Sequence, residues 1–550
     1  MGHSPLPAIF HNGRFFTSQG TNGRAHAFAE CIVTDATGRI THVGSLGDLE
    51  VAQAQDAGAV RHDMQGHVVL PGFIEGHMHL LRLGQSLQNV ALDGCKDLQG
   101  IRDTIRQYAR AHPDVPRICC KGWMYAMTGG EASTSLLDDL DPRPIYIDEK
   151  SLHSTWCNTA AVEEMGLQDM SDPQGGKIHR DASGKPTGVL AESAVMLVVW
   201  PHLAKAASME EKLSALRGAI ASYTSEGYTG AVDMAFDENM LEAVRVLRQQ
   251  EEKLPIRLAA HWLITPRTSK AENLAQVDRA IELWKEFKNE SDFRIAGIKI
   301  ICDGIIDACT AALTEPYSAN GVDCGPLWTV DDIVPVVQRA DQAGLQCALH
   351  AIGDLAIRTA IDALEQGTTA GGKRHRIEHL ELARPEDAAR LGKLGITASV
   401  QPVHADPAIL KAWPRLLGED RCGRAFAYKE FADGGAVLAL GCDAPTAPHA
   451  ALQNIYIAAT RRSARDPALG ETPMMNPHFA LELAAAVAAA TAGSAYSCYL
   501  DQWAGKLEVG LSADLAVVDM EWDAEKLLEA KVKQTWFQGV KVYDAAAASA

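Results

Sequence analysis

Two histidines close together in the sequence are the first residues that could do chemistry. His77 and His79 follow VVLPGFIEG, an apolar stretch with the length and composition of a buried strand. Because side chains alternate along a strand, both imidazoles project to the same side and can reach one metal ion. An HxH pair alone is a weak signal, since such histidines are more often surface or core residues. Its position at the end of a predicted inner strand favours metal binding.

Two further histidines, His350 and His379, follow other apolar stretches in LQCALH and RIEHLEL. Singly, each is more often a structural histidine than a ligand, but four imidazoles at strand ends together predict one metal site. Imidazole nitrogens suit zinc, and manganese, cobalt or iron could also bind. We therefore expect a divalent metal cofactor, zinc before the others, with one or two ions.

A lysine, Lys299, interrupts the apolar stretch AGIKIICDG. A buried ammonium is costly, so we expect this lysine to be paired, deprotonated or modified. A deprotonated lysine could react with CO2 to give a carbamate that bridges two metal ions. The alternative is an ion pair with Asp303, which shares its side of the strand.

An aspartate, Asp443, ends the last apolar stretch, LALGCDAP. A carboxylate there can bind the metal, take a proton from bound water and deliver it to a leaving nitrogen. The alternative is a helix cap or turn residue, which the following Ala444-Pro445 favours. With the four histidines, Asp443 predicts hydrolysis by metal-activated hydroxide, with Asp443 as general base and general acid. No GxSxG elbow, Walker motif or dinucleotide fingerprint offers a competing chemistry.

Eight apolar stretches of strand length, each followed by a helical pattern, would position these residues. They are VVLPGFIEGHMH, TGAVDMA, IRLAAHWLI, RIAGIKIICDG, LQCALHAIGD, RIEHLEL, ITASVQPV and AVLALGCDAP, with helices such as Val330–Ala343 and Pro385–Leu394 between them. This alternation predicts an α/β fold, a (β/α)8 TIM barrel over residues 69–504. Barrel enzymes carry their chemistry at the carboxyl ends of the strands, where we expect all the candidate ligands.

Short β segments at both ends of the chain, residues 1–68 and 505–550, predict a small composite β-sandwich domain. Within the barrel, the first two strands are separated by far more chain than one crossover helix needs. We expect this insertion, about residues 88–203, to cap the barrel mouth and carry part of the substrate pocket. In it Trp123, with neighbouring methionines and a tyrosine, suits a bulky apolar substituent or simply core packing.

In this order, the HMH motif, the strand lysine, the two later histidines and the final aspartate resemble the amidohydrolase superfamily. The segments PGFIEGHMHL, GIKIICDG, LHAIGD, RIEHLEL, GCDAP and GKLEVGLSADLAVVD resemble amidohydrolase family 3, a branch that includes deformylases of N-substituted formamides. The resemblance covers nearly the whole chain. It implies a barrel with a composite β-sandwich and a metal site of six residues, His77, His79, Lys299, His350, His379 and Asp443.

The sequence also departs from that family pattern. Glu75 stands where an aspartate is commoner, and Gly76 and Cys442 stand where a serine is commoner, which affects the surroundings of the ligands and not the ligands themselves. The resemblance places His153 and Glu192 near the pocket, where they could contact substrate or be structural. We count Asp303 and His404 as further candidate substrate contacts; for His404 a solvated loop position is the alternative.

The bulk composition excludes several classes of partner. With 51 Lys and Arg against 70 Asp and Glu, the net charge of −19 disfavours nucleic acid and anionic membranes. No signal peptide or membrane span is recognisable, and the 12 scattered cysteines without a CxxC pair predict reduced thiols in a cytoplasmic protein. The partner we expect is a small-molecule, amide-like substrate. Assembly into a homo-oligomer is an alternative that stays open.

These patterns predict a metal-dependent hydrolase acting on a non-peptide C–N bond, an amide of a hydrophobic, N-substituted small molecule. A mononuclear ring deaminase is the second enzyme hypothesis, although a single-metal site needs no bridging lysine. The third hypothesis is a non-catalytic barrel scaffold, which has no physical need for six converging ligands.

Overall fold

The computed structural model describes residues 6–17, 28–150, 152–173, 176–251, 253–369, 373–465 and 474–548. The chain forms two compact units. The first comprises Met1–His79, Ile220–Leu241 and Arg245–Ala550, and the second Leu80–Ala219 with Glu242–Val244.

An eight-stranded sheet is the centre of the first unit, with the order β19-β18-β17-β16-β15-β14-β13-β6. Every neighbouring pair along this path is parallel, as predicted from the βα alternation. The strands are β6 (Phe73–Met78), β13 (Tyr228–Phe236), β14 (Arg257–Ile264), β15 (Phe293–Ile301), β16 (Gln346–Ala351), β17 (Arg376–His379), β18 (Thr397–Val400) and β19 (Leu438–Leu440).

The first and last strands of this sheet meet just beyond the end of β19. Met78 forms a parallel bridge with Ala444. The backbone N–H of Asp443 donates to the carbonyl of His77 at 2.7 Å, and that of His79 donates to Ala444 at 2.9 Å. The sheet is therefore nearly closed as a barrel, and the seam lies at the predicted ligands.

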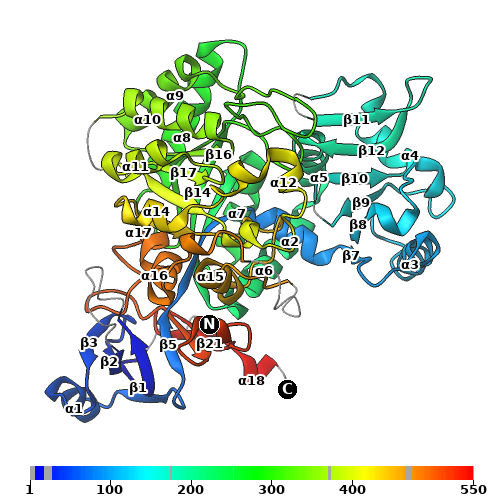
Figure 1. The fold of residues 1–550 in the computed structure, drawn as a ribbon. Coiled ribbons are helices and arrows are strands. Elements are labelled where there is room, and N and C mark those ends of the chain that lie inside the picture. The colour runs from blue at the N-terminus through cyan, green and yellow to red at the C-terminus, as the bar shows by residue number, and fades with distance from the viewer. Residues whose placement is uncertain are drawn as a thin grey trace. The chain divides into compact units, whose positions relative to one another are not determined.

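Helices alternate with the barrel strands along the chain (Figure 1). They include α8 (Lys270–Phe287), α9 (Val330–Ala343), α10 (Asp354–Gly367), α11 (Pro385–Leu394), α14 (Tyr428–Asp433) and α15 (Ala451–Thr460). The helix predictions for Val330–Ala343 and Pro385–Leu394 are confirmed to the residue.

The stretch predicted as the first barrel strand is two strands. β5 (Val68–Pro71) pairs with β20 (Leu515–Asp519) and β1 (Ala8–Phe16), whereas β6 belongs to the barrel. Gly72 lies between them, and a Cβ atom there would come 2.3 Å from Oγ1 of Thr229. The apolar run continues through both strands because each is buried in its own sheet.

A second sheet of the first unit joins strands from both ends of the chain, in the order β22-β21-β20-β5-β1-β2-β3, with β4 paired to β1. Its remaining strands are β2 (Phe28–Thr34), β3 (Ile40–Gly44), β4 (Val60–Asp63), β21 (Lys531–Phe537) and β22 (Val540–Asp544). Phe10, Phe15, Leu515 and Trp536 pack in its core. This sheet falls in the same compact unit as the barrel, so a separate sandwich domain stays a prediction.

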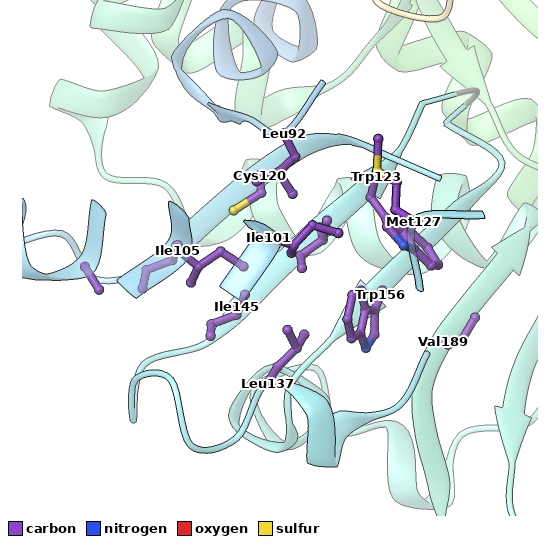
Figure 2. Packing of buried hydrophobic residues seen from close by; sticks show 13 residues of the cluster. Leu92, Ile101, Ile105, Cys120, Trp123, Met127, Leu137, Ile145, Trp156 and Val189 are labelled. Carbon is purple, nitrogen blue, oxygen red and sulfur yellow. The ribbon is translucent and has the colours of Figure 1, made fainter. Parts of the chain in front are cut away.

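The second unit has its own sheet, in the order β11-β12-β10-β9-β8-β7. The strands are β7 (Val90–Ala91), β8 (Ile118–Trp123), β9 (Ile145–Glu149), β10 (Ser154–Cys157), β11 (Gly176–Arg180) and β12 (Pro186–Glu192). Figure 2 shows its core, a cluster to which α3 (Leu98–Ala111) contributes Ile101 and Ile105 and which also contains Trp123 and Trp156. Most of the predicted insertion thus builds a unit with a hydrophobic core; its role as a cap stays a prediction.

The twelve cysteines are all free, and most are buried. This agrees with the prediction of reduced thiols. Within the described residues, no helix combines the length and the hydropathy needed to cross a bilayer.

Candidate metal centre

The predicted ligands lie at or just beyond the carboxyl ends of barrel strands. His77 and His79 are at the end of β6, and Asp443 follows β19. His350 and His379 lie near the ends of β16 and β17. Two of these residues, His379 and Asp443, have backbone φ angles of 76° and 57°, in the left-handed region that non-glycine residues rarely adopt. Such strained positions collect at functional sites, where the surrounding structure holds them.

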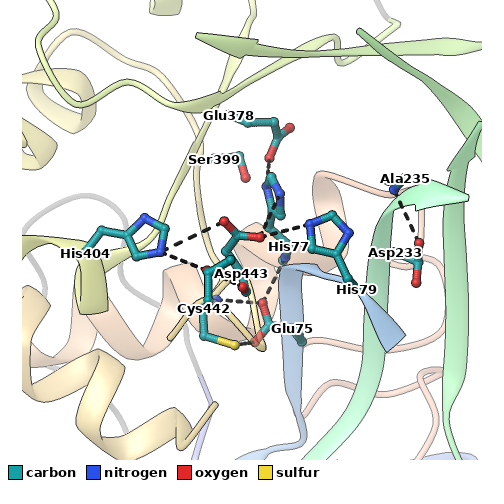
Figure 3. A network of polar contacts seen from close by, with 12 residues as sticks. Glu75, His77, His79, Asp233, Ala235, Glu378, Ser399, His404, Cys442 and Asp443 are labelled. Carbon is teal, nitrogen blue, oxygen red and sulfur yellow. Dashed lines mark hydrogen bonds and ion pairs between the residues drawn. The ribbon is translucent and has the colours of Figure 1, made fainter. Parts of the chain in front are cut away.

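His77, His79 and Asp443 form the first cluster (Figure 3). Oδ1 of Asp443 lies 3.1 Å from Nε2 of His79 and 3.5 Å from Nε2 of His77. Their candidate ligand atoms all lie within 4.8 Å of one another. The three side chains can therefore hold one ion together.

His379 connects this cluster to the remaining predicted ligands. Its ring centroid lies 4.9 Å from that of His77 and 4.3 Å from that of His350. Lys299 is buried, and its charge acts on all three of these histidines. The structure thus brings the six residues predicted as ligands to one place in the barrel.

Unpaired polar atoms test whether this place fits a cation. Among the described residues, Nζ of Lys299 and Nδ1 of His379 are buried and have no hydrogen-bond partner, and Oδ1 of Asp443 is buried with an ion-pair contact to His79 at 3.1 Å. Buried polar atoms are normally satisfied, so two unsatisfied nitrogens in one cluster indicate a place for a bound ligand. Nitrogen and oxygen donors of this kind are those that zinc and related divalent metals take. The residues fit a divalent metal.

The protonation of the histidines also suits metal binding. Burial and the nearby Lys299 lower the pKa of His77 to about 4 and that of His350 to about 3. Burial, with the neighbouring histidines, holds the pKa of His379 well below its usual value. These imidazoles are therefore neutral near pH 7, which is the form that binds metal. Burial opposes ionisation of Asp443, but His77 and His79 outweigh it and keep its pKa below the usual value.

A buried carboxylate, Glu378, orients His77. Its Oε2 lies 2.7 Å from Nδ1 of His77. Burial opposes ionisation of Glu378, but Arg376 outweighs it and holds its pKa well below the usual value. Because Glu378 is ionised and His77 is neutral, Nδ1 carries the proton and Nε2 keeps its lone pair for a metal.

Arg376 in turn fixes Glu378. Its guanidinium contacts both carboxylate oxygens, at 2.6 and 3.0 Å, and donates to Oγ of Ser399 and to the carbonyl of Gly76 at 2.6 Å each. Glu378 and Arg376 were not among the predicted site residues. A signal was present, because two charged residues occur in the buried stretch RIEH directly before a predicted ligand.

Glu75 spans the seam of the barrel. Its Oε1 accepts hydrogen bonds from the backbone N–H groups of His77 at 2.9 Å and Cys442 at 2.8 Å, and its Oε2 accepts from the thiol of Cys442 at 2.8 Å. Burial raises the pKa of Glu75 to about 7. At the neighbouring Gly76, a Cβ atom would lie 2.5 Å from the carbonyl oxygen of Leu440. The departures from the family pattern therefore sit together where β6 approaches the chain after β19.

Asp303 does not pair with Lys299 in the described structure. Its carboxylate accepts from the backbone N–H groups of Ala312, Ile352 and Gly353 at 2.8–3.0 Å. It is fully buried, and burial raises its pKa to about 7. The alternative of a Lys299–Asp303 ion pair is therefore wrong. Asp303 fixes the segments that follow β15 and β16, and its contact with substrate stays a prediction.

His404 lies beside the metal cluster. Its Nε2 is 4.0 Å from Oδ2 of Asp443, and its Nδ1 is 3.4 Å from Oε1 of Glu381. His379, Glu381 and His404 form a second group whose ligand atoms lie within 4.8 Å of one another. His404 lies at the candidate site, and its contact with substrate stays a prediction. Glu381 was not among the predicted site residues.

The other predicted substrate contacts lie in the second unit. Trp123 is fully buried, with its ring centroid 5.2 Å from that of Trp156 and 4.5 Å from that of Tyr125. This is a core position, as the core-packing alternative predicted. Nδ1 of His153 lies 3.1 Å from Oε2 of Glu192, and both side chains are partly exposed. For all three residues, contact with substrate stays a prediction.

A family comparison covers most of the chain. Residues 62–543 match the model of the amidohydrolase family, Amidohydro_3. The chain belongs to the amidohydrolase family. The predicted resemblance is therefore confirmed, and the family accounts for a divalent metal site at the carboxyl ends of the barrel strands.

Known amidohydrolases and related proteins are similar over almost their whole length. The chain is 29% identical to the protein LONG AFTER FAR-RED 3 of Arabidopsis thaliana, over 97% of this chain and 91% of that protein. It is 24% identical to N-substituted formamide deformylase of Arthrobacter pascens, over 92% and 94%. A crystal structure of an uncharacterised metal-dependent hydrolase from Pyrococcus horikoshii has the same fold, with a TM-score of 0.76 and 23% identity over 94% of this chain and 98% of that one. As a member of this family, the protein is a metal-dependent hydrolase.

Proposed function

We propose that this amidohydrolase cleaves the C–N bond of a non-peptide amide whose nitrogen carries a hydrophobic substituent. The observation that carries the proposal is the position of Asp443. Its carboxylate stands among His77, His79 and His404, with Oδ1 buried and 3.1 Å from Nε2 of His79. A carboxylate held in this way is ready to exchange a proton with a reactant.

A divalent metal held by the four histidines and Asp443, zinc first, would polarise the substrate carbonyl and lower the pKa of water. Residues of the chain perform the remaining steps, which are proton transfers. Asp443 takes a proton from the attacking water while the C–O bond forms, and then gives this proton to the nitrogen while the C–N bond breaks. The products are a carboxylic acid and an amine, so atoms and charge balance.

The surrounding residues prepare Asp443 and the imidazoles for this task. Glu378 keeps the proton of His77 on Nδ1, and Glu75 ties the backbones of His77 and Cys442 together. His404, placed between Glu381 and Asp443, would donate a hydrogen bond to an oxygen of the substrate. A carbamate on Lys299 would contribute an anionic ligand to a second ion. Burial lowers its pKa to about 8, which favours the neutral amine that captures CO2.

The comparison with N-substituted formamide deformylase supports the substrate class. That relative is similar over 94% of its own length and is named for an amide with a substituted nitrogen. The test is a hydrolysis screen with metal-reconstituted protein across N-substituted formamides, other amides, esters and aminopurines, with the released amine or ammonia measured. We expect amine release from amides. Ammonia release from aminopurines alone would favour a ring deaminase, and turnover of esters alone would refute C–N cleavage.

A further inference from the structure

A buried glutamine, Gln401, has a side chain that finds no hydrogen-bond partner in the part of the chain that the structure describes. It follows β18 directly, on the same barrel edge as the ligands, and only 2% of its surface is exposed. Among the described residues, neither Oε1 nor Nε2 of Gln401 has a hydrogen-bond partner. A buried amide that has lost water on both its donor and its acceptor side destabilises the folded state, so it calls for an explanation.

The backbone around Gln401 is, by contrast, firmly held. The carbonyl of Gln401 accepts from the backbone N–H of His404 at 2.9 Å and from the hydroxyl of Tyr428 at 3.3 Å. Asn454 anchors the next turn, accepting from the N–H of Val403 at 3.0 Å and donating to the carbonyl of Gly441 at 2.9 Å. The unpaired amide therefore stands on a fixed support, which is how binding groups are presented.

The strand pattern gives the direction of the Gln401 side chain. Ser399 faces the barrel interior, because its Oγ accepts from Arg376, which also binds Glu378. Figure 3 shows Ser399 near Glu378. Side chains alternate along a strand, so Gln401 shares the side of Ser399 and lies one step nearer the carboxyl edge. The turn that follows carries His404, whose Nε2 is 4.0 Å from Oδ2 of Asp443. Gln401 therefore stands, by its position in the chain, at the carboxyl edge from which His404 approaches Asp443.

We propose that Gln401 is a substrate-binding residue that pairs with the amide group of the substrate. Its Oε1 accepts a hydrogen bond from the substrate N–H, and its Nε2 donates one to a substrate oxygen. A carboxamide suits this task because it presents one donor and one acceptor side by side, as the substrate amide does. The proposal rests on amide hydrolysis as the function and narrows the substrate class to amides that keep an N–H. An N,N-disubstituted amide would leave Oε1 unpaired.

The test uses two matched substrates, a secondary amide and its N-methyl derivative with the same acyl and amine groups. We expect the wild-type protein to prefer the secondary amide by about tenfold or more in kcat/KM, because a site that binds an N–H discriminates strongly against its loss. Gln401→Met keeps the size of the side chain and removes both polar atoms, so this ratio should fall toward unity. Gln401→Glu keeps the acceptor and should retain a preference for the N–H substrate.

Gln346 provides the matched control. It is also fully buried, but its Oε1 lies 2.8 Å from Nε2 of His261 and its Nε2 donates to the carbonyl of Arg374. Gln346→Met should therefore lower the midpoint of urea denaturation and keep the wild-type substrate ratio. Gln401→Met should be at least as resistant to urea as the wild type, because it removes unsatisfied polar atoms.

Each outcome decides one statement. If Gln401→Met slows both substrates equally or not at all, the ratio of their kcat/KM values stays at the wild-type value. The amide of Gln401 then does not bind the substrate N–H. This result is expected if the amide holds only an ordered water. If the wild-type protein hydrolyses no amide at all, the proposed function itself is wrong. A drop in urea resistance for Gln401→Met equal to that of Gln346→Met would also overturn the inference, because it would show that the Gln401 amide has partners within the protein.

Discussion

Changing Glu378 to Gln should weaken both the fold and the metal site. The substitution keeps the shape of the side chain and removes its charge. Glu378 and Arg376 are both fully buried, and Arg376 contacts the two carboxylate oxygens at 2.6 and 3.0 Å. Removing one charge of a buried pair leaves the other uncompensated, so we expect a loss of about 3–5 kcal/mol in the free energy of unfolding. A second effect follows at His77.

Without the ionised carboxylate, the proton of His77 is no longer held on Nδ1. Loss of a carboxylate that holds a metal-binding histidine typically lowers metal affinity by about 10- to 100-fold. The assays are urea denaturation for stability and competition with a chromogenic chelator for metal affinity. Lower stability with unchanged metal affinity would show that Glu378 supports only the barrel and does not orient the ligand. No change in either quantity would refute the whole argument.

The same substitution at Glu238 is the control. Oε1 of Glu238 pairs with Nε of Arg279 at 2.8 Å, but the glutamate side chain is 60% exposed. Exposed ion pairs contribute roughly 0–1 kcal/mol, so Glu238→Gln should change the free energy of unfolding by less than about 1 kcal/mol and leave metal affinity unchanged.

Three further predictions concern both units. Burial opposes ionisation of Glu164, but hydrogen bonds, first from Arg117, outweigh it and lower its pKa to about 2 from 4.5. Its stabilisation, about 1–2 kcal/mol after allowance for solvent screening, is present above pH 4.5 and is lost as pH falls through about 2. Glu164→Gln should therefore be less stable than wild type at pH 6, and the difference should shrink as pH falls below about 2. Equal stability at pH 6 would contradict this. Trp123→Ala should lower the free energy of unfolding by about 3–5 kcal/mol and, if Trp123 also contacts substrate, change the kcat/KM ratio of bulky to small amides by about tenfold. An unchanged ratio would leave it a core residue only. Lys299→Ala should lose a second metal and most activity, with partial rescue by a short carboxylic acid; one metal per active wild-type chain would exclude the bridging role.

Local sequence patterns predicted much of the fold and the candidate ligands that gather in the barrel. His77 and His79 were predictable because strand alternation places both on one side, and the strand stretches repeat often enough to define the barrel. Residues 62–543 match the amidohydrolase family, which confirms the resemblance predicted from the motifs. Periodicity did not separate β5 from β6, because both are fully buried and the apolar run passes through Gly72.

Contacts between distant parts of the chain were not predictable in the same way. Glu378 and His77 are 301 residues apart, and only the closed sheet brings them to 2.7 Å. Asp303 was a plausible partner for Lys299 by alternation along the strand, yet three backbone N–H groups occupy its carboxylate. Those donors belong to segments whose course depends on the whole barrel, so the pairing could not be judged from spacing alone.

The most direct test of the metal centre is the metal content of purified wild-type protein and of the His77→Ala, His79→Ala double variant, measured by elemental analysis alongside amide hydrolysis. Both imidazoles lie at the barrel mouth, beside Asp443. Strand-end ligands contribute more to chemistry than to the core, so the double variant should remain folded, with the wild-type circular dichroism spectrum. We expect divalent metal and activity in the wild-type protein and neither in the variant. A folded double variant that lacks metal and keeps full activity would contradict the proposed centre.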